Sequence, residues 1–147
     1  MQLIVTLLII ISTFFFMEFI AWSVHKYIMH GFLWSLHKDH HQVNKDNVFQ
    51  KNDSFFLIFA IPSILLILNG FSSLHYTLYI GVGIALYGFA YFIVHEVIIH
   101  QRIKLLSNIN NKYIKAIRIA HKVHHKNINK DGCSSFGMLI VSIKYFK

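Results

Sequence analysis

Three long apolar runs dominate the pattern of hydrophobic and polar positions. They cover residues 3–22, 54–71 and 74–94, and the only carboxylate within them is Glu18. A helix needs roughly 20 residues to cross the hydrocarbon of a bilayer. The pattern therefore predicts three transmembrane helices. The first is expected to be retained, because the chain starts without the basic residues of a cleaved signal peptide.

The second and third runs are separated only by the uncharged turn "NGFSS", so they are expected to form a helical hairpin. Asp53 is a plausible N-cap for the second helix, and Pro62 is expected to kink it. The last apolar stretch, residues 136–143, is too short to span. It is expected to be a re-entrant or interfacial piece, or a helix packed on the domain. The fold class predicted is an all-α membrane protein with about three transmembrane helices, four at most, in a single domain of residues 1–147.

The composition supports this class. Hydrophobic residues make up 55% of the chain and charged residues only 14%, whereas soluble chains carry about 25% charged residues. A single cysteine, Cys133, excludes an internal disulfide and is expected to serve in packing.

The positive charge is distributed unevenly and predicts an orientation. All fourteen Lys and Arg residues lie in the segments that follow the first and third runs. The positive-inside rule places both segments in the cytoplasm and the N-terminus and hairpin turn outside. We therefore expect an integral protein of the cytoplasmic membrane, with the basic segment 102–130 against anionic headgroups. No nucleic-acid recognition motif accompanies the net charge of +8, so nucleic acid is not expected as a partner.

Histidine carries the strongest chemical signal. Ten of the eleven histidines fall into two copies of the same pair of patterns, H-x4-H followed by H-x2-H-H. The candidate ligands are His25, His30, His37, His40, His41, His95, His100, His121, His124 and His125. Each H-x4-H directly follows a predicted span, which makes all ten part of a histidine-rich helical cap on the cytoplasmic side. His75 stands alone and is not expected to be a ligand.

The two patterns have different helical geometry. In H-x2-H-H the three side chains share one helix face. In H-x4-H the two positions are about 140° apart on an ideal α-helix. The two rings must therefore grip a shared seam from its sides, or the helix must widen locally; the spacing leaves both open.

Neutral imidazole binds transition metals, whereas magnesium and calcium prefer oxygen ligands. Ten imidazoles are too many for one structural zinc, which takes four ligands. They suit two ions of higher coordination number, and iron in such a centre could bind and reduce O2. Asp39 and Glu96 are candidates for carboxylates that support the ligands, or for ordinary surface carboxylates. A membrane metal-binding or transport protein is the competing class.

Glu18 is a costly group inside a span and is expected to reach the interface or a polar partner such as His25. A substrate route could be lined by the aromatic residues of the first and third runs. These are Phe14, Phe15, Phe16, Tyr87, Phe89, Tyr91 and Phe92. Alternatively, these side chains face lipid or pack between helices.

At these residues the sequence resembles a known family. The boxes "HKYIMHG", "HKDHH", "HEVIIHQR" and "HKVHH", together with "DGCSSFG", resemble those of the bacterial beta-carotene hydroxylases of the fatty acid hydroxylase and sterol desaturase superfamily. The likeness covers nearly the whole chain. Glu96 stands where that family usually has Asp.

The resemblance implies an activity. Two non-haem iron ions would use O2 and electrons from an acidic, ferredoxin-like donor to hydroxylate carbon 3 of a carotenoid beta-ionone ring. The ten histidines would be the iron ligands, with no further catalytic residue, and which histidine serves which ion is left open. The alternative within the superfamily is a fatty acid, sterol or other lipid hydroxylase or desaturase.

Overall fold

The structure is a computed structural model and describes residues 1–42, 49–72, 74–109 and 111–146. These residues form helices and irregular segments and contain no strand. The helices in chain order are α1 (Gln2–Ser23), η1 (Val24–Phe32), α2 (Trp34–His41), η2 (Lys51–Ser54), α3 (Phe55–Phe71), α4 (Tyr76–Phe92), η3 (Ile93–Ile99), α5 (Lys112–His125) and η4 (Ile143–Tyr145). The predicted all-α class is confirmed.

Three helical stretches are long and apolar enough to cross a membrane. They are Gln2–Phe32, Lys51–Phe71 and Tyr76–Ile99, with 31, 21 and 24 residues. The second and third form the predicted hairpin. Within the described ranges no fourth stretch qualifies, so three spans are confirmed.

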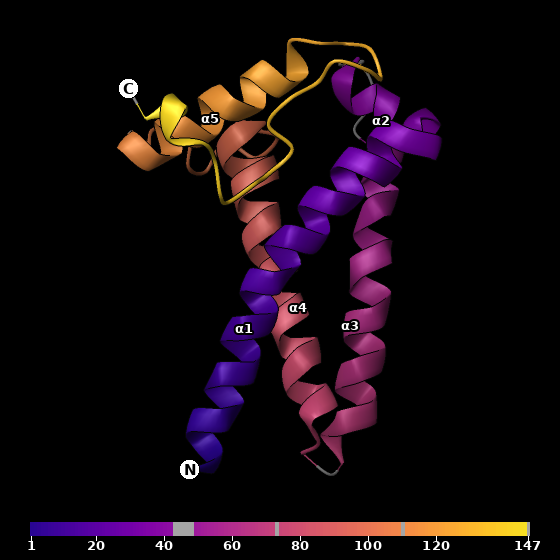
Figure 1. Ribbon diagram of the computed structural model, residues 1–147, viewed down its shortest axis with the longest axis vertical. Coiled ribbons are helices and arrows are strands. Elements are labelled where there is room, and N and C mark those ends of the chain that lie inside the picture. Colours follow the sequence, from indigo (N-terminus) through magenta and orange to yellow (C-terminus); the bar gives the residue numbers. More distant parts are fainter. Residues whose placement is uncertain (43–48, 73, 110, 147) are drawn as a thin grey trace.

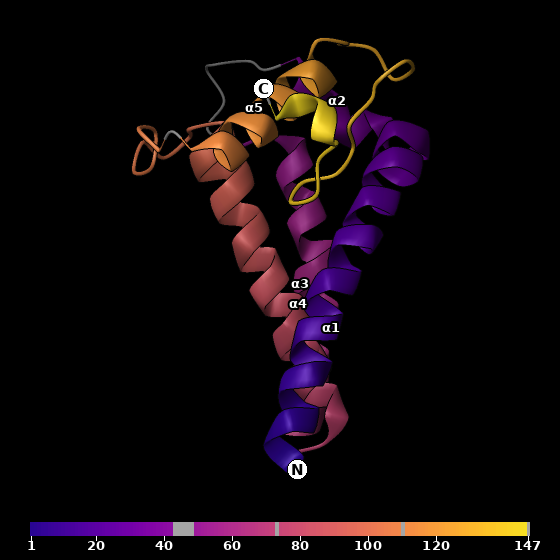
Figure 2. The same ribbon diagram turned by 60° about the vertical axis from the view of Figure 1, so that its left-hand side comes forward.

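The spans diverge from one end of the molecule toward the other (Figures 1 and 2). The N-terminus and the α3–α4 turn lie together at the narrow end. Helices α2 and α5 and the C-terminal segment lie across the wide end, as a cap. The N-terminus and the hairpin turn therefore lie at the opposite end of the spans from the segments that carry the histidine boxes, as predicted.

Small residues bring the spans together. A Cβ added at Gly83 of α4 would lie 2.7 Å from the side chain of Thr13 in α1, and one added at Gly81 would lie 2.8 Å from the carbonyl oxygen of Ser63 in α3. The Ser63 hydroxyl donates a hydrogen bond to the Gly81 carbonyl at 2.8 Å. Such close contacts and interhelical hydrogen bonds are typical of helix packing in membranes.

One local prediction needs correction and another is narrowed. Asp53 does not cap α3, whose N-cap is Ser54; it lies in the 3-10 turn η2 and accepts a hydrogen bond from the Gln50 backbone N–H at 3.0 Å. Of the alternatives for the last apolar stretch, a packed helix is excluded up to Ser142. Three of its backbone N–H groups bind a side chain described below instead of helix carbonyls.

The aromatic residues proposed for a substrate route point in different directions. Phe15, Phe16, Phe89 and Phe92 are exposed on the outside of the helices, as expected for side chains that face lipid. Tyr87 is buried, its ring against Phe14, and the ring of Tyr91 lies 5.1 Å from that of His95.

Candidate metal centre

Both H-x4-H boxes lie on widened helical turns. Segments η1 and η3 are π-helical, and the N–H of His100 donates to the carbonyl of His95, five residues earlier, at 2.9 Å. This wider turn brings residues five apart onto the same side of the helix. The ring centroids of His25 and His30 are 5.3 Å apart, and those of His95 and His100 are 4.5 Å apart. Local widening is therefore the solution that the spacing left open.

The first of these turns ends at a break in the chain. Gly31 has φ −102° and ψ −123°, outside the helical region, so the chain changes direction there before α2 begins. This turn of the chain carries the second box, His37 to His41, back over the first.

The ten histidines converge at the cap end of the spans. One group consists of His25, His30, His37, His41 and His124, and the other of His40, His95, His100 and His121. Within each group one ring nitrogen per residue lies within 4.8 Å of all the others. His125 adjoins both, with its ring centroid 4.4 Å from His121 and 4.5 Å from His41. His75 is at the other end of α4, where it caps that helix.

The two groups exchange their middle histidines. In each H-x2-H-H box, positions i+3 and i+4 point about 100° apart. Accordingly, His37 and His41 face the first group while His40 crosses to the second. In α5, His124 crosses to the first group and His121 stays in the second. The ring centroid of His125 also lies 4.6 Å from that of His40 and 5.1 Å from that of His100. We therefore count His125 with the second group, so that each group has five imidazoles.

Most of the rings are held by a hydrogen bond at Nδ1. The Nδ1 atoms of His25, His30, His41 and His124 lie 3.1, 2.9, 2.9 and 3.0 Å from the carbonyl oxygens of Phe136, Lys130, Asn127 and Ser134. A carbonyl only accepts, so each Nδ1 carries the proton and donates it. The Nε2 atom of each ring is then left with a free lone pair that faces its group.

Three further rings are held by side chains. The Nδ1 of His37 donates to Asn52 at 2.6 Å, that of His40 to Gln50 at 3.2 Å, and that of His95 to Glu96 at 2.6 Å. Glu96 thus contacts one of the candidate histidines; that it supports a metal ligand stays a prediction.

Asp39 lies one step further out. It accepts hydrogen bonds from the backbone N–H groups of Lys51 and Asn52 at 2.5 and 3.3 Å, and so fixes η2, the turn that carries Asn52. Its carboxylate acts on His37 only through Asn52.

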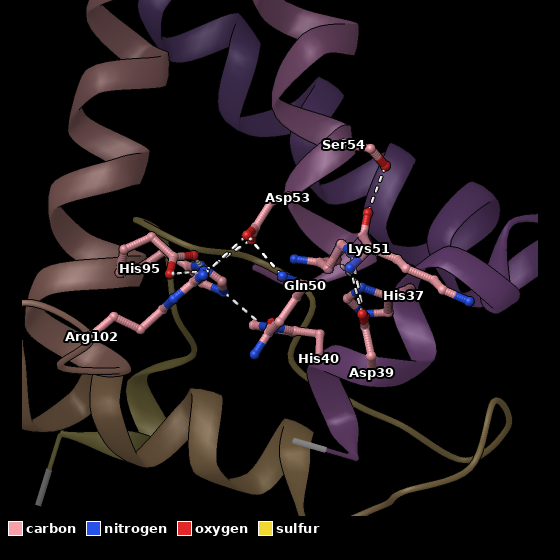
Figure 3. Close-up of polar contacts among 11 residues, drawn as sticks. His37, Asp39, His40, Gln50, Lys51, Asp53, Ser54, His95 and Arg102 are labelled. Atoms are coloured by element: carbon pink, nitrogen blue, oxygen red, sulfur yellow. Dashed lines mark hydrogen bonds and ion pairs between the residues drawn. The ribbon is translucent and has the colours of Figure 1, made fainter. Parts of the chain in front are cut away.

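An ion-pair network ties η2 to the end of the third span (Figure 3). Arg102 donates to both carboxylate oxygens of Asp53 at 2.9 and 3.0 Å and to Glu96 at 2.8 Å. Glu96 in turn accepts from His95. Arg102 thereby links the segment before α3 to the partner of a histidine in the second group.

Burial keeps the imidazoles outside the spans neutral. It lowers the pKa of His37 and of His125 to about 2 and the pKa of His41 to about 4. Burial lowers the pKa of His40 and of His121 well below the usual value. Neutral imidazole is the form that binds metal.

Two buried nitrogens lack any partner among the described residues. They are the Nε2 atoms of His41 and His125, one from each group of five. A buried polar atom without a partner is costly, and a cation at each convergence point would satisfy it. The donor set, neutral imidazole nitrogens without oxygen ligands, fits transition-metal ions and not magnesium or calcium.

A cavity opens on the second group. Its volume is about 390 Å³ and its lining consists of Ile99, His100, Arg118, His121, Lys122 and His125. The first group is covered instead by Phe136, whose ring centroid lies 5.2 to 5.5 Å from those of three histidines. The two groups therefore differ in their access to solvent.

A family model described as fatty acid hydroxylase matches residues 10–144. The chain belongs to the fatty acid hydroxylase family. Within the family it is 42% identical over 132 residues to a beta-carotene hydroxylase of Pantoea ananas, covering 90% of this chain and 75% of that protein. A beta-carotene hydroxylase of Pseudescherichia vulneris is 39% identical, with 93% and 77% covered.

A chloroplastic beta-carotene 3-hydroxylase of Arabidopsis thaliana is 33% identical over 113 residues, which are 74% of this chain and 37% of that protein. No solved structure gave a significant match. The predicted resemblance to the bacterial members of the fatty acid hydroxylase family is confirmed.

Several of the hydrogen bonds that hold the histidine rings could not be predicted from the sequence. Asn52 and Gln50 lie outside the histidine boxes, and four carbonyl partners belong to the backbone of residues 127–136. The motif "DGCSSFG" marks part of that backbone, and the "R" of "HQR" is the Arg102 of the ion-pair network. In the sequence, both motifs stand out only through the resemblance to the family, and neither indicates which atoms it would contact.

Proposed function

We propose that this chain is a membrane di-iron monooxygenase that hydroxylates carbon 3 of the beta-ionone rings of carotenoids. Beta-carotene would give cryptoxanthin and then zeaxanthin. The observation that carries the proposal is the convergence of ten histidines in two groups beside apolar spans, in a chain 42% identical to a beta-carotene hydroxylase.

In this proposal all ten histidines are metal ligands through Nε2, five for each ion. Bound iron supplies the activation of O2: one oxygen atom enters a C–H bond, and the other leaves as water with two electrons and two protons from an external donor. The chain itself holds seven of the ten imidazoles in the neutral tautomer through Nδ1 hydrogen bonds and buries the ligands away from water. Such outer hydrogen bonds orient ligands and raise their basicity.

The position of the site suits a lipophilic substrate. A carotenoid is dissolved in the bilayer and is about as long as the membrane is thick. A metal pair at the end of the spans would receive one ring end while the polyene stays in lipid.

We further propose that the cap faces the cytoplasm, where the positive-inside rule puts its lysines. A small acidic electron-transfer protein of the ferredoxin type would be attracted by the exposed basic residues of α5, in a salt-sensitive encounter.

The decisive experiment is expression in bacteria that accumulate beta-carotene, followed by pigment chromatography. Cryptoxanthin and zeaxanthin should appear with the native chain and be absent with His40→Ala produced at the same level. Unchanged beta-carotene despite folded, iron-loaded protein would contradict the proposed substrate.

The family description supports one alternative, hydroxylation of a fatty acid or another lipid. Profiling of the total lipids of the same cells would detect it. A metal transporter is disfavoured, because a transporter places its polar ligands at the depth of the membrane midplane, whereas both histidine groups lie at one end of the spans. Measurement of iron content and O2 uptake would separate the enzyme from a metal-binding protein: about two irons per chain together with O2 consumption would favour the enzyme.

A further inference from the structure

The carboxylate of Glu18 binds the end of the chain. It is buried within the first span, and its Oε1 accepts hydrogen bonds from the backbone N–H groups of Met138, Leu139 and Ile140 at 2.9, 2.9 and 3.0 Å. Its Oε2 accepts from the hydroxyl of Tyr87 at 2.8 Å. All four partners are donors, so both carboxylate oxygens accept hydrogen bonds within the protein. The predicted partner, His25, is not among them.

The chain just before these N–H groups carries the carbonyls that hold the first histidine group. We call residues 127–140 the carbonyl segment. Its carbonyls at Asn127, Lys130, Ser134 and Phe136 accept from four of the five histidines of that group. No histidine of the second group has an Nδ1 hydrogen bond to this segment among the described residues.

The backbone of the carbonyl segment includes two residues with positive φ. Ser135, between two of the accepting carbonyls, has φ 66°, and Gly132 has φ 83°. A non-glycine residue in this region costs of order 1–3 kcal/mol and persists only where its surroundings impose it. Gly137 lies against the carboxylate: a Cβ there would be 2.6 Å from the Ile140 carbonyl oxygen and 3.5 Å from Oε1 of Glu18.

We infer that Glu18 is a positioning residue for the first histidine group, because it anchors the segment whose carbonyls orient His25, His30, His41 and His124. The second group does not depend on it, since its Nδ1 partners are Gln50 and Glu96. The inference rests on the proposed function in that two metal ions are expected, one for each group.

The test compares variants of the full-length protein in detergent. Glu18→Met keeps the size of the side chain and removes both acceptors, whereas Glu18→Gln keeps one acceptor for the N–H groups. Ser63→Ala is the matched control, because it removes another buried hydrogen bond of the spans, far from the carbonyl segment. Glu96→Gln is the converse variant, aimed at the second group.

Iron content and Mössbauer spectra of 57Fe-loaded protein are the readouts, together with hydrogen exchange of residues 127–140. Glu18→Met should bind about one iron per chain instead of about two and exchange faster in that segment. The signal it loses should be the one that Glu96→Gln leaves unchanged. Glu18→Gln should retain most of the iron, and Ser63→Ala all of it.

Equal loss of both iron signals in Glu18→Met, or no loss despite faster exchange, would overturn the inference. If Glu18→Met does not fold, Tyr87→Phe removes a single hydrogen bond from the same anchor and must weaken the same signal selectively. A native chain that never binds about two irons would refute the proposed function instead, so the two failures are distinguishable.

Discussion

At the scale of single residues, the site is defined by the direction of ring nitrogens. Seven of the ten histidines have Nδ1 fixed by an oxygen acceptor, so Nε2 is the atom offered to each group. The identity of the acceptor differs between groups: the first uses carbonyl and amide oxygens, and the second includes the carboxylate of Glu96. A carboxylate makes its imidazole a stronger electron donor, so the two groups should not bind metal equally.

Loss of one ligand should be disabling. His40→Ala removes the histidine that crosses from the second box into the second group, and should lower iron content and abolish hydroxylation. His75→Ala, at the far end of α4, should change neither. Iron analysis and pigment chromatography measure both effects, and a fully active His40→Ala would show that the crossing has no function.

The outer hydrogen bonds should matter almost as much. Asn52→Leu deprives the buried His37 of its acceptor and should weaken metal binding by about 10- to 100-fold. Asn69→Leu, an exposed site near the α3–α4 turn, is the control and should have no effect. Competitive titration with a chelator gives the affinity of each variant; equal affinities would mean that the orientation of His37 does not depend on Asn52.

At the scale of elements, two π-helical turns and the two helices α2 and α5 make the site. The π-turns align the H-x4-H pairs, and α2 and α5 each send histidines to both groups. The spans beneath carry these turns, so the close α1–α4 crossing at Gly83 is expected to stabilise the part of the fold that supports the site.

That crossing can be tested with a pair of glycines on α4. Gly83→Ala places a methyl group 2.7 Å from Thr13 and should destabilise the fold by about 1–3 kcal/mol, as overpacking does. Gly88→Ala meets nothing within 4 Å and should be neutral, or stabilising by up to about 1 kcal/mol. Thermal unfolding in detergent compares the two, and equal melting temperatures would contradict the importance of the crossing.

The sequence was sufficient to predict the three spans and the candidate histidines, but not the contacts between the elements. The three spans follow from the length of apolar runs, and the ten candidate histidines follow from two repeated spacings. The division into two groups depends on how α2 and α5 are placed relative to each other. The spacing of the histidines along the chain does not show this. The carbonyl partners in residues 127–136 are backbone atoms, which every residue has, so no side chain reveals them. Glu18 is conspicuous in the sequence as an acid within an apolar run, but three of its four partners lie some 120 positions away in the chain.

At the scale of the whole molecule, the fold puts all ten histidines at one end of the spans and the N-terminus and hairpin turn at the other. If the cap faces the cytoplasm, both ions are loaded and reduced from that side, and the substrate enters from the bilayer. Under the proposed function, the orientation of the chain in the membrane is then a requirement for activity.

Orientation can be read with single cysteines in a Cys133→Ser background. Tyr76→Cys is at the turn end and Lys126→Cys follows α5 in the cap; both sites are exposed. A membrane-impermeant thiol reagent should label Tyr76→Cys on intact cells, and Lys126→Cys only after permeabilisation. The reverse pattern would place the cap outside the cell.

The crossing of His40 and His124 also makes the assembly of the two centres depend on both halves of the chain. Each proposed ion takes imidazoles from both halves, so neither half holds a complete set of ligands. The first group further uses residues 127–140, which come after all ten candidate histidines in the sequence. Under the proposed function, a complete pair of iron sites would therefore form only when residues 25–140 are all present, and a fragment that ends before His121 would lack ligands of both groups.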